Sequence, residues 1–298
     1  MLPRRTLLAL PAFLPGLLRA QPRPVTVAAF SILGDLARQV AGDDAPIRVL
    51  AGPETDPHLF QPRPSEAEAI RGAALVIRNG LGFEPWLDRL LAATRHAGPV
   101  VTATEGITPL PASAGHGHTR GAAAPDPHAW QDVGLARSYV RVIAAGLAAA
   151  DPAREAPIRA AEAAYLARLA ALDAWVRERL ATVPAERRVM VTSHAAFGYF
   201  ARAYDVRVLA VQGVAAEGQA SAGRVAALIR QIRAERITAV FIEGRRSQAV
   251  LERLAADAGV VPRGRLYAET LSPPDGPAAT YEAMVRQNIG LMVPAMLG

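Results

Sequence analysis

The sequence alternates short runs rich in β-branched residues with longer segments of helical periodicity. Such alternation predicts parallel strands joined by helices that cover both faces of a sheet. The pattern occurs on each side of an Ala-rich segment, so we expect an α/β protein of two lobes, each with a mostly parallel β-sheet flanked by helices. The predicted strands of the first lobe are 25–27, 47–50, 75–77 and 100–102, with helices at 32–40, 66–71 and 84–93. Those of the second lobe are 188–192, 206–211, 239–242 and 266–268.

The middle of the chain predicts two successive helices. The first covers 135–149 and ends before Pro152, because a proline disfavours helical backbone in the residue before it. The second covers 153–182, a segment of mainly Ala, Leu, Glu and Arg without glycine, which would span roughly 40 Å at 1.5 Å per residue. We therefore expect one long rigid helix to join the lobes. The predicted organisation is a signal peptide at 1–20, an N-terminal lobe at 21–152, a linking helix at 153–183 and a C-terminal lobe at 184–298.

The composition favours a globular protein that does not bind nucleic acid. Hydrophobic residues make up 51% of the 298 residues and charged residues 20%, which is too apolar for a disordered chain. The net charge is +6, and every basic residue is an arginine. Three of the 33 arginines lie in the first 20 residues; without them, 30 basic residues face 27 acidic ones, a net charge of +3. We therefore expect no nucleic-acid partner.

The first 20 residues have the order of an export signal. Arg4 and Arg5 precede an apolar run from Leu7 to Leu18, and Ala20 ends a small-residue cleavage site. The run is too short to cross a membrane, and we expect Sec export rather than twin-arginine export. The chain has no cysteine, hence no disulfide and no lipid-attachment cysteine. The predicted product is a soluble periplasmic protein without a lipid anchor.

Motifs of several enzyme classes are absent. Gly80-Leu81-Gly82 lacks the third glycine of a dinucleotide-binding loop, and neither G-x-S-x-G nor H-E-x-x-H occurs. The absence of cysteine and lysine excludes thiol and Schiff-base catalysis. The chemistry of the chain therefore depends on its six histidines.

Two of these histidines lie in nearly the same hexapeptide. Residues 56–61 read Asp-Pro-His-Leu-Phe-Gln, and residues 126–131 read Asp-Pro-His-Ala-Trp-Gln. Proline fixes φ before each histidine, so His58 and His128 are presented by a backbone that has little freedom left to lose on binding. The aspartate of each motif can cap or orient its loop. One such histidine alone is more often structural, whereas the pair indicates a metal site.

A third histidine and a carboxylate follow predicted strands of the second lobe. His194 lies just past the strand at 188–192, and Glu269 holds the equivalent place after 266–268. Ligands of open α/β sheets bind at the carboxyl ends of the strands. Three imidazoles and one carboxylate form a tetrahedral set suited to zinc. Glu243, after the strand at 239–242, is a competing fourth ligand by the same logic, and the residues alone leave that choice open.

Taken together, these motifs resemble the zinc/manganese solute-binding proteins of ABC importers, the cluster A-I family. The resemblance covers the whole mature chain and rests on the two Asp-Pro-His motifs and on residues 191–200, 241–243 and 280–288. It implies two α/β lobes joined by a rigid helix, with the metal between them. His58, His128 and His194 fall on the first three ligand positions. Glu269 falls where the family usually has aspartate, so its side chain is one methylene longer.

The resemblance also implies a function. Manganese-importing members carry a carboxylate where His194 stands, so the third imidazole favours Zn²⁺, with Mn²⁺ as second choice. We expect a monomeric, high-affinity periplasmic zinc-binding protein that is not an enzyme and that delivers the ion to an ABC-type metal permease in the inner membrane. A periplasmic zinc chaperone is a further expected partner.

Two other functions stay open at this point. One is a manganese- or iron-binding carrier of the same family; the other is a secreted zinc hydrolase with Glu269 as general base and water as fourth ligand.

The loop at 112–125 contains His116 and His118 and resembles a shortened form of the His-rich loop of relatives. We expect it to catch zinc weakly, to receive zinc from a partner, or to have no role.

Overall fold

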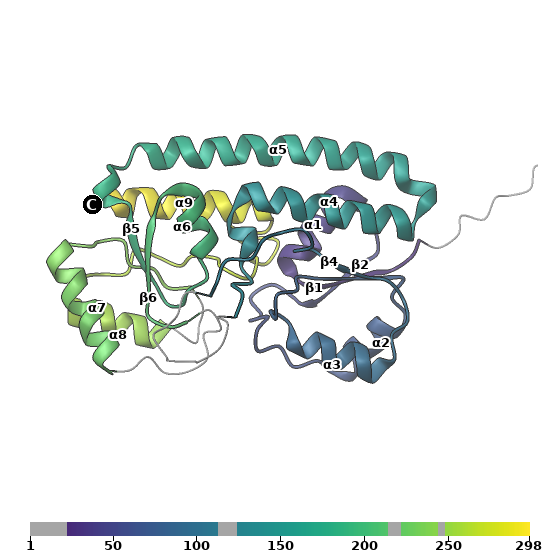
Figure 1. The fold of residues 1–298 in the computed structure, drawn as a ribbon, viewed down its shortest axis with the longest axis horizontal. Coiled ribbons are helices and arrows are strands. Elements are labelled where there is room, and N and C mark those ends of the chain that lie inside the picture. Colours follow the sequence, from purple (N-terminus) through teal and green to yellow (C-terminus); the bar gives the residue numbers. More distant parts are fainter. Residues whose placement is uncertain (1–22, 113–123, 214–221, 244–247) are drawn as a thin grey trace, which may run out of the picture.

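The computed structural model describes residues 23–112, 124–213, 222–243 and 248–298. The predicted signal peptide at 1–20 lies outside the described residues, as do His116 and His118. The described chain forms an α/β protein of two lobes bridged by one long helix (Figure 1). The predicted fold class is therefore confirmed.

The first lobe contains a four-stranded parallel sheet. Its strands are β1 (Thr26–Phe30), β2 (Ile47–Ala51), β3 (Leu75–Arg78) and β4 (Val100–Thr102), in the order β2-β1-β3-β4. Thr26 pairs with Ile47 on one side and with Leu75 on the other, so β1 is a central strand. All four strands lie within three residues of their predicted bounds. The central strands β1 and β3 are buried and read as continuous apolar runs, whereas β2 and β4 lie at the edges of the sheet and are partly exposed.

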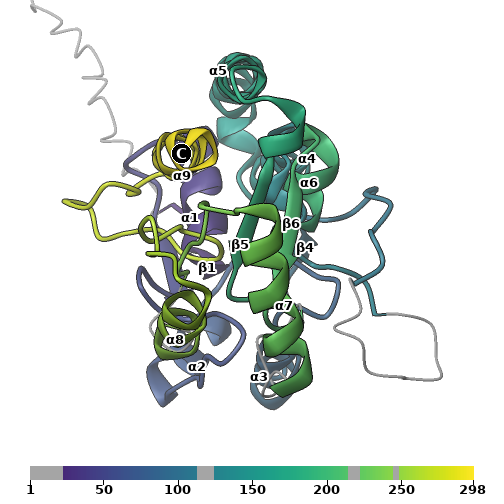
Figure 2. The same cartoon turned by 90° about the vertical axis from the view of Figure 1, so that its left-hand side faces the viewer.

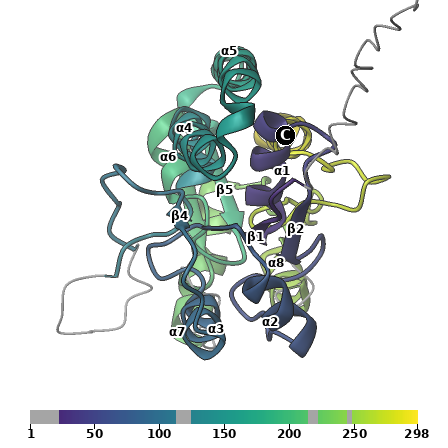
Figure 3. The same cartoon turned by 90° about the vertical axis from the view of Figure 1, so that its right-hand side faces the viewer.

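Helices cover both faces of this sheet. Helix α1 (Ser31–Ala41) and helix α4 (Val133–Ala150) lie on one face, and α2 (Pro64–Arg71) and α3 (Pro85–Thr94) lie on the other (Figure 3). Helix α4 is long and apolar enough to cross a membrane by length and composition. Its buried residues, such as Val140 and Ile143, instead face the protein interior, since α4 packs on β3, β4 and α5 (Glu155–Ala181).

The described part of the second lobe contains fewer regular strands than the sequence predicts. Strands β5 (Val189–Thr192) and β6 (Arg207–Ala210) pair in parallel. The predicted strands at 239–242 and 266–268 are wrong as regular strands: residues 240 and 242 form single parallel bridges to Val191 and Arg265. Side chains occupy the backbone groups of the second of them. The backbone N–H and carbonyl of Tyr267 are hydrogen-bonded to the side chain of Asn288, and the carbonyl of Ala268 accepts hydrogen bonds from side chains of the first lobe rather than from a strand.

Among the described residues, four helices complete the second lobe. Helix α6 (Gly198–Tyr204) starts four residues after His194, because the loop that carries His194 occupies the preceding positions. Helices α7 (Ala222–Glu235) and α8 (Gln248–Ala258) lie below the strands (Figure 2). Helix α9 (Tyr281–Leu297) lies above them and packs against α5.

The long helix α5 runs along the top of both lobes (Figure 1). It packs against α1 and α4 of the first lobe and against α9 of the second. Its 27 residues correspond to about 40 Å. The buried positions recur every three or four residues and include Tyr165, Leu169, Leu172 and Val176, so one stripe of α5 belongs to the core.

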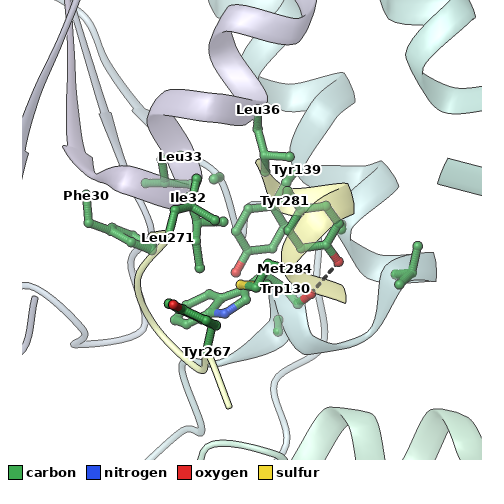
Figure 4. Close-up of a cluster of buried hydrophobic side chains, with 14 of the residues drawn as sticks. Phe30, Ile32, Leu33, Leu36, Trp130, Tyr139, Tyr267, Leu271, Tyr281 and Met284 are labelled. Carbon is green, nitrogen blue, oxygen red and sulfur yellow. Dashed lines mark hydrogen bonds between the residues drawn. The ribbon is translucent and has the colours of Figure 1, made fainter. Parts of the chain in front are cut away.

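A continuous apolar core joins the lobes. Phe30, Leu33 and Leu36 of the first lobe belong to the same buried cluster as Tyr281 and Met284 of α9, with Trp130 between them (Figure 4). A smaller cluster, which includes Val191, Ile232 and Leu254, is confined to the second lobe. Because the larger cluster crosses between the lobes, moving one lobe away from the other would expose apolar side chains.

Substitution of Gly146 tests the close packing of α4 on the sheet. A Cβ at this position would lie 2.4 Å from Cγ2 of Val101. We expect Gly146→Ala to lower the free energy of unfolding by about 1–3 kcal/mol, the usual cost of overpacking. The matched control is Gly290→Ala in α9, where nothing lies within 4 Å of the added Cβ. That variant should gain roughly 0.5–1 kcal/mol through helix propensity alone. Urea denaturation measures both; equal effects would contradict the packing argument.

Candidate metal centre

The four side chains singled out in the sequence meet at one point between the lobes. His58 follows β2, His128 precedes α4, His194 follows β5 and Glu269 follows the bridge at Arg265. The Oε1 atom of Glu269 lies 2.7 Å from Nε2 of His58, 3.0 Å from Nε2 of His128 and 2.7 Å from Nε2 of His194. One ligand atom from each side chain lies within 4.8 Å of the other three.

The spacing of these atoms matches a small tetrahedral ion. Zinc binds imidazole nitrogen at about 2.0–2.1 Å, which places neighbouring ligand atoms roughly 3.4 Å apart. The Nε2 atoms of His58 and His128 are 3.4 Å apart. Glu269 is closer to the imidazoles than this because its oxygen is hydrogen-bonded to them. If the Glu269 oxygen moved away from the three imidazoles by about half an ångström, the hydrogen-bonded group would become a tetrahedral ligand set.

The group is shielded from water. His128 is fully buried and His194 is 5% exposed. The side chains of His58 and Glu269 are 9% and 13% exposed to solvent. Charges and charge-assisted hydrogen bonds are stronger in such an environment than in bulk water.

Buried carboxylates orient two of the imidazoles. Oδ1 of Asp126 accepts hydrogen bonds from Nδ1 of His128 at 2.8 Å and from its backbone N–H at 3.0 Å. Glu243 accepts a short hydrogen bond from Nδ1 of His194 and further bonds from the backbone N–H groups of Ser193 and His194. A carboxylate on Nδ1 fixes the ring and leaves the Nε2 lone pair for an ion. Glu243, considered from the sequence as a competing ligand, thus lies behind His194 rather than among the four converging atoms.

The two Asp-Pro-His motifs differ in how they hold their histidines. Asp56 accepts hydrogen bonds from the backbone N–H groups of His58 and Leu59, at 3.0 and 3.4 Å, and so caps the loop. The carbonyl of Pro57 accepts a bond from Nε1 of Trp86 at 2.8 Å. The ring of His58 packs edge-on against Phe83, with 4.4 Å between centroids. The first motif therefore fixes the ring of its histidine mainly by aromatic packing.

The loop that carries Glu269 is anchored on the first lobe. The carbonyl of Ala268 accepts hydrogen bonds from Nε1 of Trp130 at 2.9 Å and from Nε2 of Gln131 at 2.6 Å. The backbone N–H of Leu271 donates to Oγ of Ser31 at 2.9 Å. Trp130 and Gln131 belong to the second Asp-Pro-His motif, so the same hexapeptide supplies one imidazole and holds the carboxylate in place.

A buried network behind His128 is not evident in the sequence. Glu84 is fully buried and accepts hydrogen bonds from the backbone N–H groups of Asn79 and Gly80, at 2.5 and 3.2 Å. Burial raises the pKa of Glu84 to about 7, although these bonds lower it. Asn79 in turn donates to the carbonyl of Pro127 at 3.0 Å. In the sequence, the one signal of this network is a glutamate four residues after Gly80, at the start of the predicted helix at 84–93.

Burial and opposing charges act on the pKa values of His128, His194 and Glu269. Burial alone would lower the pKa of His128 and His194, but the carboxylates raise both: Asp126 and Glu269 for His128, Glu243 and Glu269 for His194. The pKa of His194 lies well above its ordinary value. Burial would raise the pKa of Glu269, but the charges of His194 and His58 and the hydrogen bonds hold it well below its usual range. Without metal, the carboxylate is therefore ionised and protons occupy sites that an ion would take.

Known metal-binding proteins are similar to this chain over most of its length. The family described as the periplasmic component A of the zinc-uptake complex matches residues 26–295. The chain belongs to this family. It is 33% identical over 263 residues to the iron-binding protein YfeA of Yersinia pestis, an alignment that covers 88% of this chain and 83% of the relative. It is 30% identical over 267 residues to the manganese-binding lipoprotein MntA of Halalkalibacterium halodurans, covering 90% and 86%.

A solved relative has the same architecture. The periplasmic zinc-binding protein TroA of Treponema pallidum superposes with a TM-score of 0.82 at 31% identity, covering 92% of this chain and 99% of that chain. A manganese-bound periplasmic metal-binding protein of Candidatus Liberibacter asiaticus gives a TM-score of 0.81 at 26% identity, covering 92% and 100%. The protein is thus a metal-binding solute-binding protein of the ABC-transporter type, a family of transport proteins rather than enzymes. These relatives are named for zinc, manganese or iron, so family membership leaves the metal undecided.

The raised pKa values predict a strong pH dependence of metal affinity. Because His128 and His194 hold protons to higher pH than free imidazole, metal must displace those protons. Apparent zinc affinity should therefore rise with pH from about 5 through and beyond about 6.5. Competition with a chromophoric chelator between about pH 5 and 9 measures it, and an affinity independent of pH would contradict the assignment.

The stability of the metal-free protein should follow a different course. The raised histidine pKa values stabilise the fold below about pH 6.5, and this contribution is lost as pH rises through the folded values. The lowered pKa of Glu269 stabilises the fold above about pH 4.5, and this contribution is lost as pH falls through the folded value. The centre therefore contributes most between about pH 4.5 and 6.5, and thermal unfolding with chelator present tests this window.

Proposed function

We propose that this protein is a high-affinity extracytoplasmic zinc carrier with His58, His128, His194 and Glu269 as ligands. The observation that carries the proposal is the convergence of three Nε2 atoms on one carboxylate oxygen, at 2.7 to 3.0 Å. Three imidazoles and one carboxylate form a nitrogen-rich set that suits Zn²⁺, whereas Mn²⁺ prefers more oxygen ligands. A manganese or iron carrier is the alternative, supported by the similarity to relatives named for those metals.

The position of Glu269 favours a carrier over a hydrolase. A catalytic zinc site keeps one position open to water, with a general base standing beyond that water. Here the carboxylate oxygen is within hydrogen-bond distance of all three imidazoles, where a fourth ligand would lie. A closed set of four protein ligands suits a protein that must hold an ion without activating water.

We further propose the partners and organisation that family membership implies. The carrier delivers zinc to an ABC-type metal permease in the inner membrane, with a periplasmic zinc chaperone as a second partner. It is secreted without a lipid anchor, although several relatives are named as lipoproteins. We place the lobes at 21–152 and 184–298, with the linking helix at 153–183, and expect a monomer.

Zinc titration of the metal-free mature protein tests the proposal. We expect one zinc ion per chain and a clear preference for zinc over manganese in competition. His128→Ala should lose more affinity than the roughly 10- to 100-fold that removal of an outer-shell partner costs. His96→Ala is the matched control, because His96 is not one of the four clustered side chains. Tighter binding of manganese would favour the alternative carrier, and wild-type affinity in His128→Ala would place the site elsewhere.

A further inference from the structure

The carboxylate that orients His128 lies against the second lobe. Asp126 is 2% exposed. Its Oδ1 atom holds the ring and the backbone N–H of His128. Its Oδ2 atom faces the first residue of α6, Gly198, where an added Cβ would lie 2.6 Å from Oδ2 and 3.8 Å from Cγ. A contact shorter than 3.0 Å forces one of the two groups to move.

Tyr199, the next residue of α6, fixes the backbone of Asp126. Its hydroxyl donates to the carbonyl of Asp126 at 2.9 Å and accepts from the backbone N–H of Leu110 at 3.0 Å. The backbone N–H of Asp126 donates to the carbonyl of Leu110 at 2.8 Å. Asp126 therefore cannot shift as a whole, and any displacement of Oδ2 must rotate its carboxylate.

Backbone conformation does not explain the glycine at position 198. Gly198 is helical and does not have the positive φ that favours glycine elsewhere in the chain. What the position requires is space for the carboxylate. Because the two oxygens of Asp126 rotate together, a methyl group that displaces Oδ2 also moves Oδ1 off Nδ1 of His128.

We propose that Gly198 is a positioning residue for metal binding: its missing side chain leaves the space that Asp126 occupies while it orients His128. This inference rests on the proposed function of the four-residue centre. Gly198 follows His194 by four residues, on the same segment of the second lobe. The contact of α6 with the first lobe that seats the carboxylate behind His128 therefore lies close in the chain to His194.

A double-mutant cycle tests the proposal by zinc affinity. Gly198→Ala should weaken zinc binding roughly 10- to 100-fold, as expected when an outer-shell partner is lost. Asp126→Ala should have a similar effect. The double variant should lose no more zinc affinity than Asp126→Ala alone, because the methyl group added at position 198 then has no carboxylate to displace. Gly223→Ala, near the start of α7 with nothing within 4 Å of its added Cβ, should bind like the wild type.

Tyr199→Phe gives a second readout that leaves residue 198 unchanged. It removes the hydroxyl that fixes Asp126, and we expect a severalfold loss of zinc affinity that disappears in an Asp126→Ala background. The proposal is overturned if Gly198→Ala binds zinc like the wild type, or if its effect persists in full without the carboxylate. A folding defect in Gly198→Ala that Asp126→Ala does not relieve would also overturn it. Failure of the wild type to bind zinc would instead refute the proposed function.

Discussion

The centre depends on one carboxylate oxygen shared by three imidazoles, of which those of His128 and His194 are buried. A buried charge is costly unless it is paired and hydrogen-bonded. Glu269 meets this condition through three imidazoles, two of which are in turn held by Asp126 and Glu243. The metal-free centre is therefore a compensated charge cluster. An ion that replaces protons on the imidazoles would likewise face a negatively charged carboxylate.

The rest of the fold holds this cluster at a fixed size. Helix α5 packs on both lobes, and the larger apolar core runs between them without interruption. The Glu269 loop starts in the second lobe but is hydrogen-bonded to Trp130, Gln131 and Ser31 of the first. His194 and Glu243, by contrast, belong wholly to the second lobe. The site thus forms where the two lobes meet, with ligand residues and their supporting contacts supplied by both.

Local sequence patterns were sufficient for much of the fold. The central strands of the first lobe could be predicted because buried parallel strands are apolar runs bounded by turns. The predicted strands at 239–242 and 266–268 were wrong as regular strands, because the hydrogen bonds of their backbone are determined by contacts with distant residues. Ala268 is bonded to Trp130, 138 residues away, and no local pattern reports such a bond. The imidazole positions were accessible because a repeated hexapeptide and a strand end mark them. The roles of Glu243 and Glu84 could not be predicted from the sequence, because the side of an imidazole on which a carboxylate lies depends on tertiary structure.

The most direct test of this account is a crystal structure of the mature protein loaded with zinc. We predict one ion bound by Nε2 of His58, His128 and His194 at about 2.0–2.1 Å, with an oxygen of Glu269 as the fourth ligand. Glu243 should remain on Nδ1 of His194, and Asp126 on Nδ1 of His128. A structure with Glu243 or water on the metal, and Glu269 turned toward solvent, would contradict the account.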